Sequence, residues 1–276
     1  MSTNQIVIYQ ATRQGRARMD CAAETLTAVA EQQPGVYTVA RSYSGNRVLC
    51  FERHLARLEE SAQLSGIPLA LDRAWLRGAL RACLEELGYP EVRFCVSVPA
   101  DAPDVYYLAF EPLHPVPERV LRAGVSVYTT DLNRHTPRAK STGWIAARRE
   151  ARAALPADAY EGLLTGPDEA ILEGTESNFY AVVDGALRTA GEGVLGGTAR
   201  AVLLEVAPAV IPVRLQPATL ADLPRLDEAL LTSSSRGVVP ITRINGQTVG
   251  DGRPGPITEA LRQRYDAWAE AHLEPL

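Results

Sequence analysis

The sequence predicts a mixed fold of the α+β (α/β) class. It has a small N-terminal domain over residues 1–113, an interdomain linker over residues 114–122 and a larger strand-rich domain over residues 123–276. Apolar runs of strand length alternate with longer stretches of helical periodicity. A proline-dense segment, residues 111–118, separates the two parts, because proline cannot continue a strand ladder. With 276 residues, 46% of them hydrophobic, the chain can bury one large or two modest cores.

The first domain is expected to combine strands with two helices. Its strand-like runs are residues 6–9, 36–40, 48–51, 92–98 and 105–110, and its helical patterns are residues 52–65 and 72–87. Asp72 stands at the start of the second helical pattern, where its carboxylate can accept a hydrogen bond from the first turn. We therefore expect Asp72 to be the N-cap of that helix.

The second domain is expected to be richer in strands. Its strands are predicted at residues 124–130, 171–173, 179–183, 229–232 and 238–244, and its helices at residues 141–154, 199–206 and 257–272. Asp184-Gly185 and Asn245-Gly246 have the composition of tight turns. Strands and helices therefore follow one another without an internal repeat.

Composition excludes several classes of function. A net charge of −5 and a pI near 5.5 argue against a nucleic-acid partner, which would require a basic face. Residues 1–5 lack a basic segment followed by an apolar one, and no run of about 18 apolar residues occurs, so we expect a cytoplasmic protein without a membrane span. The cysteines and histidines lack metal-ligand spacing, so we expect reduced thiols, no metal, and a packing role for His54.

Two segments carry groups suited to a phosphorylated ring. Glu173 precedes Gly174 and a polar corner, so its carboxylate stands at a strand end where it can meet a ring nitrogen. The glycine-rich residues 191–198 run into a helix, whose N-terminus presents N–H groups and the positive dipole end to a phosphate. The alternatives are a charge beside a hairpin for Glu173 and an ordinary loop with Thr198 as N-cap.

Lys140 follows a turn-like segment, residues 136–139, and opens the helix expected over residues 141–154. Its amine can form a Schiff base where burial or a neighbouring cation such as Arg138 favours the neutral form. Residues 232–235 offer closely spaced N–H groups and hydroxyls as a second anion site. Taken singly, a solvated lysine and a solvated loop are the better explanations, but the order and spacing of all the segments favour the joint interpretation.

At these positions the sequence resembles the class IV, fold-type IV pyridoxal-phosphate enzymes. They include branched-chain aminotransferases, D-amino-acid aminotransferases, R-selective amine transaminases and aminodeoxychorismate lyase. Five blocks occur in the family's order, namely residues 53–62, Lys140, Glu173-Gly174 with residues 177–180, residues 195–198, and residues 232–235 before Val239-Pro240. The resemblance implies pyridoxal 5'-phosphate as cofactor, a two-domain structure with the cofactor between the domains, and a homodimer.

The resemblance also implies a role for each matched residue. Lys140 forms the Schiff base with the cofactor and moves the proton at the substrate α-carbon, and Glu173 pairs with the protonated ring nitrogen. Arg57 is the side-chain cation on the phosphate, which holds the aldehyde carbon against Lys140. The other implied cofactor-binding residues are Ser177, Asn178, Gly197, Thr198, Ser233 and Ser234.

The expected substrate pocket departs from the family pattern. Ala23 stands where many members carry the phenylalanine of a Phe-Glu motif, which removes bulk from one side of the pocket. Arg93 and Arg138 are candidates for a substrate carboxylate, with a structural ion pair and a solvated loop charge as their respective alternatives. Trp144, one helical turn after Lys140, is a candidate wall of the pocket or a core residue.

We therefore expect an aminotransferase that moves an amino group between an amino acid, possibly a D-amino acid, or a primary amine and a 2-oxo acid such as 2-oxoglutarate or pyruvate. Aminodeoxychorismate lyase, which releases pyruvate and 4-aminobenzoate, is an alternative, because one fold supports both chemistries. A non-catalytic protein that binds the cofactor or a phosphorylated metabolite is a more distant alternative, since a binder needs neither Lys140 nor Glu173.

Overall fold

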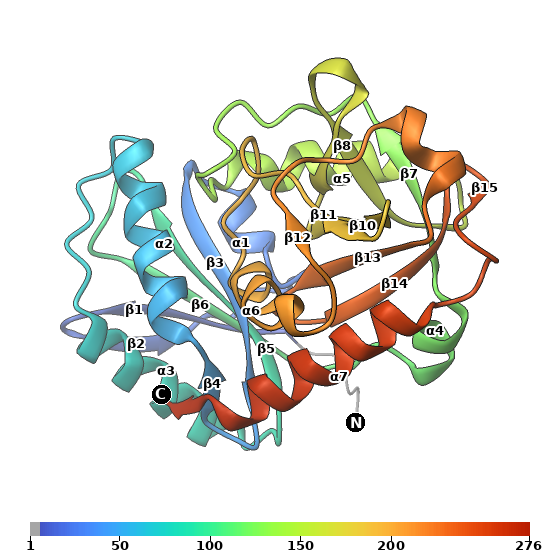
Figure 1. Cartoon of the computed structure of the whole chain (residues 1–276). Coiled ribbons are helices and arrows are strands. Elements are labelled where there is room, and N and C mark those ends of the chain that lie inside the picture. The colour runs from blue at the N-terminus through green and yellow to red at the C-terminus, as the bar shows by residue number, and fades with distance from the viewer. Residues whose placement is uncertain (1–5) are drawn as a thin grey trace. The chain divides into compact units, whose positions relative to one another are not determined.

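The computed structural model describes residues 6–276, so residues 1–5, where no export signal is expected, lie outside the described residues. The mixed, strand-rich structure confirms the predicted fold class. The chain forms two compact units (Figure 1). The first comprises Met1–His114, Ala139–Ala146 and His272–Leu276, and the second comprises Pro115–Arg138 and Ala147–Ala271. Sequence patterns do not reveal that two later segments, one of them carrying Lys140, belong to the first unit.

The expected linker, residues 114–122, is partly helical. Helix α4 (Glu118–Ala123) begins directly after Pro117, whose φ of −59° is compatible with the entry to a helix. Gly124 ends α4 with a φ of 70°, which a glycine adopts without strain. The division into two domains at this linker stays a prediction.

A seven-stranded antiparallel sheet forms the centre of the first unit. Its strands, in spatial order, are β16 (Leu273–Pro275), β4 (Arg47–Leu49), β3 (Gly35–Tyr43), β5 (Val92–Pro99), β6 (Tyr106–Pro112), β1 (Val7–Thr12) and β2 (Gly15–Arg18). The long central strands β3, β5 and β6 are mostly buried, and the exposed strand β2 closes one edge.

Helices cover both faces of this sheet, because successive side chains of a strand point to opposite faces. The helices are α1 (Ala28–Glu31), α2 (Phe51–Leu64), α3 (Arg73–Leu87) and the first turn of α5 (Gly143–Ala154). Val36 of β3 belongs to the core formed with α2 and α3. Its neighbour Tyr37 belongs to a second core, formed with α1 and Ile145 of α5.

Both helices predicted for the first unit are confirmed. Asp72 is the N-cap of α3, and its carboxylate accepts a hydrogen bond from Trp75 N–H at 3.0 Å. The strand predicted over residues 48–51 ends earlier than expected, at Leu49. Cys50 takes a left-handed conformation with a φ of 48°, which stops the strand, and Phe51 is already the first residue of α2.

The second unit contains a ring of strands that closes on itself. The ring consists of β10 (Asn178–Val183), β13 (Glu228–Ser233), β14 (Gly237–Ile244), β7 (Val125–Thr130), β8 (Ala159–Thr165) and β9 (Ile171–Gly174), and β9 pairs with β10. β7 is parallel to both of its neighbours, and the other pairs of the ring are antiparallel. Apolar side chains such as Val127, Phe179 and Leu231 form its core. Closure leaves no open sheet edge within the ring.

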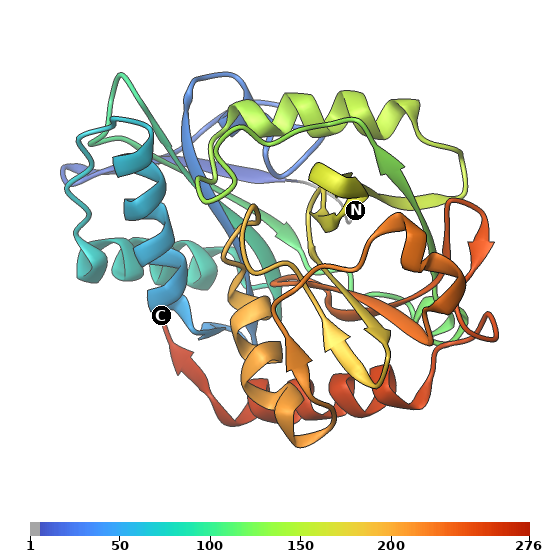
Figure 2. The same cartoon turned by 45° about the horizontal axis from the view of Figure 1, so that its top comes forward.

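Short elements extend the ring, and two helices pack on its outside. The short elements are β11 (Ala186–Arg188), β12 (Val213–Arg214), β15 (Gln247–Thr248), and the 3-10 helices at Pro167–Glu169, Ala207–Ala209 and Leu220–Arg225. Helix α6 (Thr198–Val206) contacts β13 and lies beside α7 (Pro256–Ala271), the red helix of Figure 2. The predicted helices at residues 199–206 and 257–272 are thus confirmed, as are the turns at Asp184-Gly185 and Asn245-Gly246, whose residues have positive φ.

Two predictions for the second half of the chain are wrong. Strand β8 follows α5 but was not predicted. The helix expected from residue 141 begins at Gly143 instead, because Ser141 forms an isolated β-bridge with Val36. Lys140 is therefore not on the helix.

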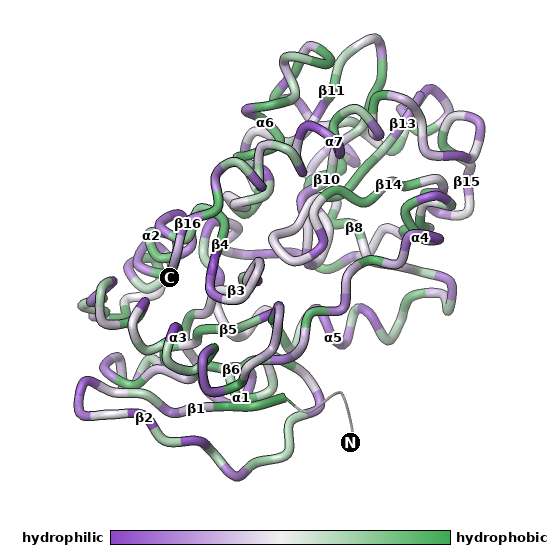
Figure 3. The backbone as a smooth tube through the Cα atoms, turned by 90° about the horizontal axis from the view of Figure 1, so that it is seen from below, coloured by the Kyte–Doolittle hydropathy of each residue, from purple (hydrophilic) through white to green (hydrophobic). Residues whose placement is uncertain are grey.

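Along α5 the hydropathy alternates between polar and apolar positions (Figure 3), as expected for a helix with one buried face.

The cysteines of the described chain are not joined in disulfides. Cys21 is exposed, Cys50 is half-buried, and Cys83 and Cys95 are buried. Burial raises the pKa of the Cys83 thiol to about 11. Within residues 6–276 no helix is long and apolar enough to cross a membrane, and no group of three or more potential metal ligands occurs.

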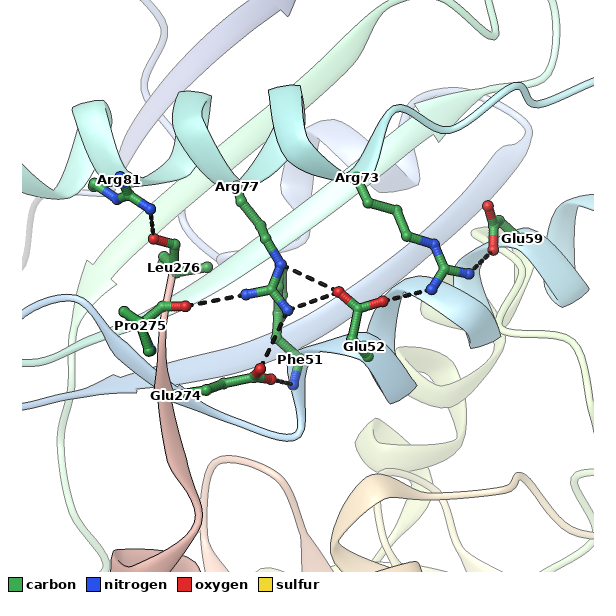
Figure 4. Close-up of polar contacts among 9 residues, drawn as sticks. All are labelled: Phe51, Glu52, Glu59, Arg73, Arg77, Arg81, Glu274, Pro275 and Leu276. Atoms are coloured by element: carbon green, nitrogen blue, oxygen red, sulfur yellow. Dashed lines mark hydrogen bonds and ion pairs between the residues drawn. The ribbon is translucent and has the colours of Figure 1, made fainter.

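Strand β16 brings an unexpected cap to α2 (Figure 4). Cys50, the N-cap residue of α2, makes no side-chain capping bond. Instead, Glu274 Oε1 accepts a hydrogen bond from Phe51 N–H at 2.6 Å, and Glu274 also pairs with Arg77 of α3 at 3.5 Å. Arg77 in turn donates to Glu52 at 2.8 Å. A carboxylate from β16 therefore replaces the missing local cap at the positive end of the helix dipole.

Replacing this cap should weaken the first unit. We expect Glu274→Ala to lower the free energy of unfolding by about 1 kcal/mol, since an orphan N–H of α2 loses its acceptor. Urea unfolding followed by circular dichroism measures the change. Glu85→Ala, at an exposed position of α3, is the matched control. Equal stability of the two variants would contradict the capping role.

Candidate active site

Lys140 is the single lysine of the chain and lies in a short segment bound to the start of β3. Its carbonyl accepts a hydrogen bond from Tyr37 N–H at 3.0 Å, and Thr142 N–H donates to the Gly35 carbonyl at 2.9 Å. The Nζ atom lies 4.7 Å from the centroid of the buried Tyr37 ring. The main-chain pairing and the aromatic face together fix the direction of the amine.

Helix α2 brings Arg57 into the same cluster. Lys140 N–H donates to Ser61 Oγ at 2.9 Å, and Ser61 Oγ donates to the Arg57 carbonyl at 2.7 Å. The Arg57 side chain is buried, and its Nη2 donates to Thr38 Oγ1 at 3.2 Å. One hydroxyl therefore links the main chain of the predicted Schiff-base lysine to that of the predicted phosphate-binding arginine.

His54 completes this cluster without adding charge. Its Nδ1 lies 3.0 Å from Thr38 Oγ1 and 3.4 Å from Arg57 Nη2. Because a guanidinium only donates, Nδ1 is the acceptor and the ring proton is on Nε2. Burial, and then the charges of Arg57 and Lys140, hold the pKa of His54 well below its ordinary value of 6.5. His54 also stacks against Phe51, so its predicted packing role is confirmed.

Glu173 lies at the centre of a second cluster, in the second unit. Its side chain is 2% exposed, and Oε1 accepts a hydrogen bond from Arg134 Nη1 at 2.9 Å. Oε2 accepts hydrogen bonds from Asn178 Nδ2 at 3.2 Å and from Leu195 N–H at 3.0 Å. Hydrogen bonds and a cation favour the charged form of a buried carboxylate. The carboxylate is therefore held in one position, because the Asn178 side chain and the Leu195 main chain both donate to the same oxygen.

The glycine-rich turn is attached to this carboxylate. Asn178 Nδ2 also donates to the Leu195 carbonyl at 2.9 Å, and Gly197 N–H donates to the same carbonyl at 2.8 Å. A Cβ atom at Gly197 would lie 2.2 Å from Asn178 Oδ1, so only glycine fits there. Gly197 is the N-cap residue of α6, and the expectation of Thr198 as N-cap is wrong, because Thr198 is already the first helical residue.

The run of hydroxyl residues begins at the end of β13, beside the same strands. Asn178 of β10 is paired with Glu173 of β9 on one side and with Thr232 of β13 on the other. Ser233 is the last residue of β13, and Ser234 follows in the turn to β14. The structure therefore brings Glu173 and Gly197 next to Asn178, and Ser233 follows Thr232, the strand partner of Asn178.

Ser177 has a different partner. Its Oγ donates to Glu161 Oε1 at 2.8 Å, and Glu161 is a second buried carboxylate on β8. Sequence reasoning did not single out Glu161, because it lies in the unpredicted strand β8. A role of the Ser177 side chain as a direct cofactor ligand stays a prediction.

The three candidate substrate residues differ in their surroundings. Arg93 pairs with Glu111 at 3.0 Å, which is the ion pair considered as the alternative. Arg138 is exposed, and Trp144 is buried. Trp144 does not lie one helical turn after Lys140, because α5 begins between them. Their roles towards a substrate stay predictions.

Sequence reasoning also missed Arg134 and Tyr37. Arg134 stands in an irregular polar stretch in which nothing distinguishes it from its exposed neighbours, yet its side chain is only 8% exposed. Tyr37 lies on a strand that was predicted, and its alternation with Val36 indicates only that the two face opposite sides of the sheet. Its approach to Lys140 depends on a pairing between residues about 100 positions apart.

The residues present fit a phosphorylated pyridine. Thr198 Oγ1 is buried and has no hydrogen-bond partner among the described residues, a costly state that an anionic oxygen at the start of α6 would relieve. Glu173 presents a buried carboxylate in the same unit, and the first unit presents a directed amine and a buried guanidinium. These are the groups that bind a phosphate, a protonated ring nitrogen and an aldehyde.

Comparison with known proteins agrees with this geometry. Residues 35–244 match the model of the family described as amino-transferase class IV. A probable branched-chain-amino-acid aminotransferase from Thermotoga maritima is 32% identical over 245 residues, covering 85% of this chain and 86% of the relative. A D-alanine aminotransferase from Staphylococcus epidermidis is 27% identical, covering 86% of this chain and 89% of the relative.

The fold agrees as well. The crystal structure of a putative branched-chain amino acid aminotransferase from Thermotoga maritima superposes with a TM-score of 0.80 at 29% identity, covering 95% of this chain and 96% of that chain. A T.th. branched-chain amino acid aminotransferase, solved with pyridoxamine 5'-phosphate, gives a TM-score of 0.81 at 22% identity, covering 98% of both chains, and so shows the shared fold. The chain belongs to the class IV aminotransferase family. It is a fold-type IV, pyridoxal-phosphate-dependent enzyme that transfers amino groups between amino acids and 2-oxo acids.

The neutral state of His54 predicts a pH dependence of stability. In the unfolded chain His54 binds a proton below about pH 6.5, whereas in the folded chain it does so only at lower pH. The unfolded state therefore binds more protons, and stability should fall as pH drops below 6.5, by at most about 1.4 kcal/mol per pH unit.

Thermal unfolding between pH 7.5 and 5.5 tests this expectation. His54→Gln should flatten the fall, and the exposed His135→Gln should retain it. The same pH profile in His54→Gln and in the wild type would contradict the assignment.

Proposed function

We propose that Lys140, Glu173 and Arg57 are the principal active-site residues for transamination between an amino acid and a 2-oxo acid. The observation that carries the proposal is the buried carboxylate of Glu173, fixed by Arg134, Asn178 and the Leu195 N–H. A protein that only binds a phosphorylated metabolite has no use for such a group. When bound, pyridoxal phosphate supplies an aldehyde that condenses with amines and a protonated ring that withdraws electrons.

Glu173 would accept the ring N–H. Its two oxygens accept hydrogen bonds from the three donors named above, and these donors fix the direction of the carboxylate. Arg134 is a supporting residue, because its guanidinium donates a charge-assisted hydrogen bond to Oε1 at 2.9 Å.

Lys140 would hold the cofactor aldehyde and then move the proton at the substrate α-carbon with Nζ. The Tyr37 ring, 4.7 Å from Nζ, directs the amine and leaves it little freedom. The main chain of Lys140 is tied to α2 through Ser61. A positioned base gains its efficiency from such restriction, because the orientation is set before the reaction.

Arg57 in the first unit and the start of α6 in the second unit each offer donors that suit a phosphate. The N–H groups of the first turn of α6 and the hydroxyl of Thr198 suit an anion, and Ser233 and Ser234 add hydroxyl donors. Because His54 is neutral, it does not repel the positive charge of Arg57, whereas a protonated imidazole at 3.4 Å would.

The nature of the donor follows from the relatives. The relatives described above are aminotransferases named for D-alanine or for branched-chain amino acids, which supports an amino-acid donor over a primary amine. We also propose a homodimer in the cytoplasm, on the strength of the family resemblance, and sedimentation of the purified protein tests the dimer. Spectral change on adding D-alanine, L-leucine, L-glutamate or R-1-phenylethylamine in separate samples identifies the donor class and its hand.

Lys140→Ala should abolish turnover and the visible absorption of the bound cofactor. Because the chain has no other lysine, borohydride reduction should attach the cofactor to one side chain in the wild type and to none in the variant. Peptide mass mapping locates the label. Undiminished activity of Lys140→Ala would refute the proposed role.

Glu173→Gln tests the ring-nitrogen partner separately. The amide keeps the size of the carboxylate but loses its charge, so we expect turnover to fall by roughly 10²-fold or more while the cofactor stays bound. Absorbance and single-turnover kinetics measure the two effects. Asp222→Asn, which alters a buried acid elsewhere in the same unit, is the control. Full activity of Glu173→Gln would show that the ring does not depend on this carboxylate.

A further inference from the structure

A second buried carboxylate lies behind the corner between β9 and β10. Glu161, on β8, is 3% exposed. Its Oε1 accepts hydrogen bonds from Ser177 Oγ at 2.8 Å and from Glu176 N–H at 2.6 Å, and its Oε2 accepts one from Arg236 Nη2 at 2.8 Å. Three donors from two different segments therefore meet on one buried side chain.

The corner itself is shaped by this carboxylate. A Cβ atom at Gly174 would lie 2.3 Å from both Glu161 Oε1 and Ser177 Oγ, well inside van der Waals contact. Arg148 of α5 holds the same corner through Glu176, at 3.1 Å. The residue that follows Glu173 must therefore be glycine so that the corner can close on Glu161.

Arg236 joins Glu161 to the turn between β13 and β14. Its Nε donates to Ser233 Oγ at 2.9 Å while its Nη2 donates to Glu161, and its guanidinium carbon lies 5.3 Å from the centroid of the Tyr160 ring. Burial acts to lower the pKa of Arg236, but Glu161, Tyr160 and Glu176 together raise it by more, so the pKa lies above its ordinary value. The rigid fork of arginine can donate to two acceptors in different elements at once.

The bond to Ser233 also orients that hydroxyl. Because Oγ accepts a hydrogen bond from Arg236, its own hydrogen is directed elsewhere and can be donated. A charged donor polarises the hydroxyl and strengthens the hydrogen bond that the hydroxyl gives. An anion at the turn is the acceptor that this arrangement suits, in agreement with the proposed contact of Ser233 with the phosphate.

We infer that Arg236 is a positioning residue, which sets the turn of Ser233 and Ser234 against the corner that carries Glu173. The distance between the phosphate donors, Ser233 and Ser234, and the acceptor for the ring nitrogen, Glu173, is then fixed. Buried ion pairs add little net stability, so a geometric role accounts better for the cost of burying Glu161. The inference rests on the proposed function, since it takes Ser233 and Glu173 as ligands of the same cofactor.

A double-mutant cycle on the holoenzyme tests the inference, with Arg236→Gln, Glu161→Gln and the double variant. Each single change should raise the Kd for pyridoxal phosphate about tenfold, and the double variant should be no weaker than the worse single one, because both changes remove the same bridge. The ³¹P chemical shift of the bound cofactor should move in all three variants. Arg225→Gln is the matched control and should change neither quantity, since Arg225 pairs with the buried Asp222 at 2.5 Å.

Two results would overturn the inference. One is a wild-type Kd and ³¹P shift in Arg236→Gln, even with a lower melting temperature, because that combination marks an ion pair of purely structural value. The other is additive losses in the double variant. If Arg236→Gln does not fold, the double variant still decides, since it leaves no buried charge unpaired. Failure of the wild type to hold pyridoxal phosphate on Lys140 would instead refute the proposed function.

Discussion

The amide of Asn178 is the constraint on which the cofactor cluster of the second unit depends. Its main chain lies between β9 and β13, its Nδ2 donates to Glu173 and to the Leu195 carbonyl, and its Oδ1 faces Gly197. Glu173, the entry to α6 and the end of β13 are therefore located by one residue. A side chain without an N–H donor would remove one hydrogen bond from the buried Glu173 carboxylate and one from the Leu195 carbonyl.

The two clusters handle buried charge in different ways. In the second unit each buried carboxylate has its own arginine, Arg134 for Glu173 and Arg236 for Glu161, together with main-chain donors. In the first unit the buried imidazole of His54 stays uncharged near neutral pH, so no second positive charge lies beside Arg57.

Local patterns predicted the helices and most strands, because periodicity is a property of neighbouring residues, and the resemblance to the class IV family implied the type IV fold. Local patterns could not predict contacts between distant segments. Ser61 was not suspected, since its hydrogen bond to Lys140 joins residues 79 positions apart. Glu161 and Arg236 were missed for the same reason, and β8 was not predicted although Pro156 and a turn separate it from α5. The motif Glu173-Gly174 was recognised, but the need for its glycine became evident only from Glu161.

The single lysine has a consequence for the chemistry of the whole surface. Of the 28 basic side chains only Lys140 carries a primary amine, and the others are arginines. Arginine stays protonated and does not condense with aldehydes under mild conditions. The surface thus offers no second side-chain amine to compete for the carbonyl compounds that such an enzyme handles. An amine-directed acylating reagent would therefore modify one side chain besides the α-amino group of the chain, and it would leave the arginine charges unaltered.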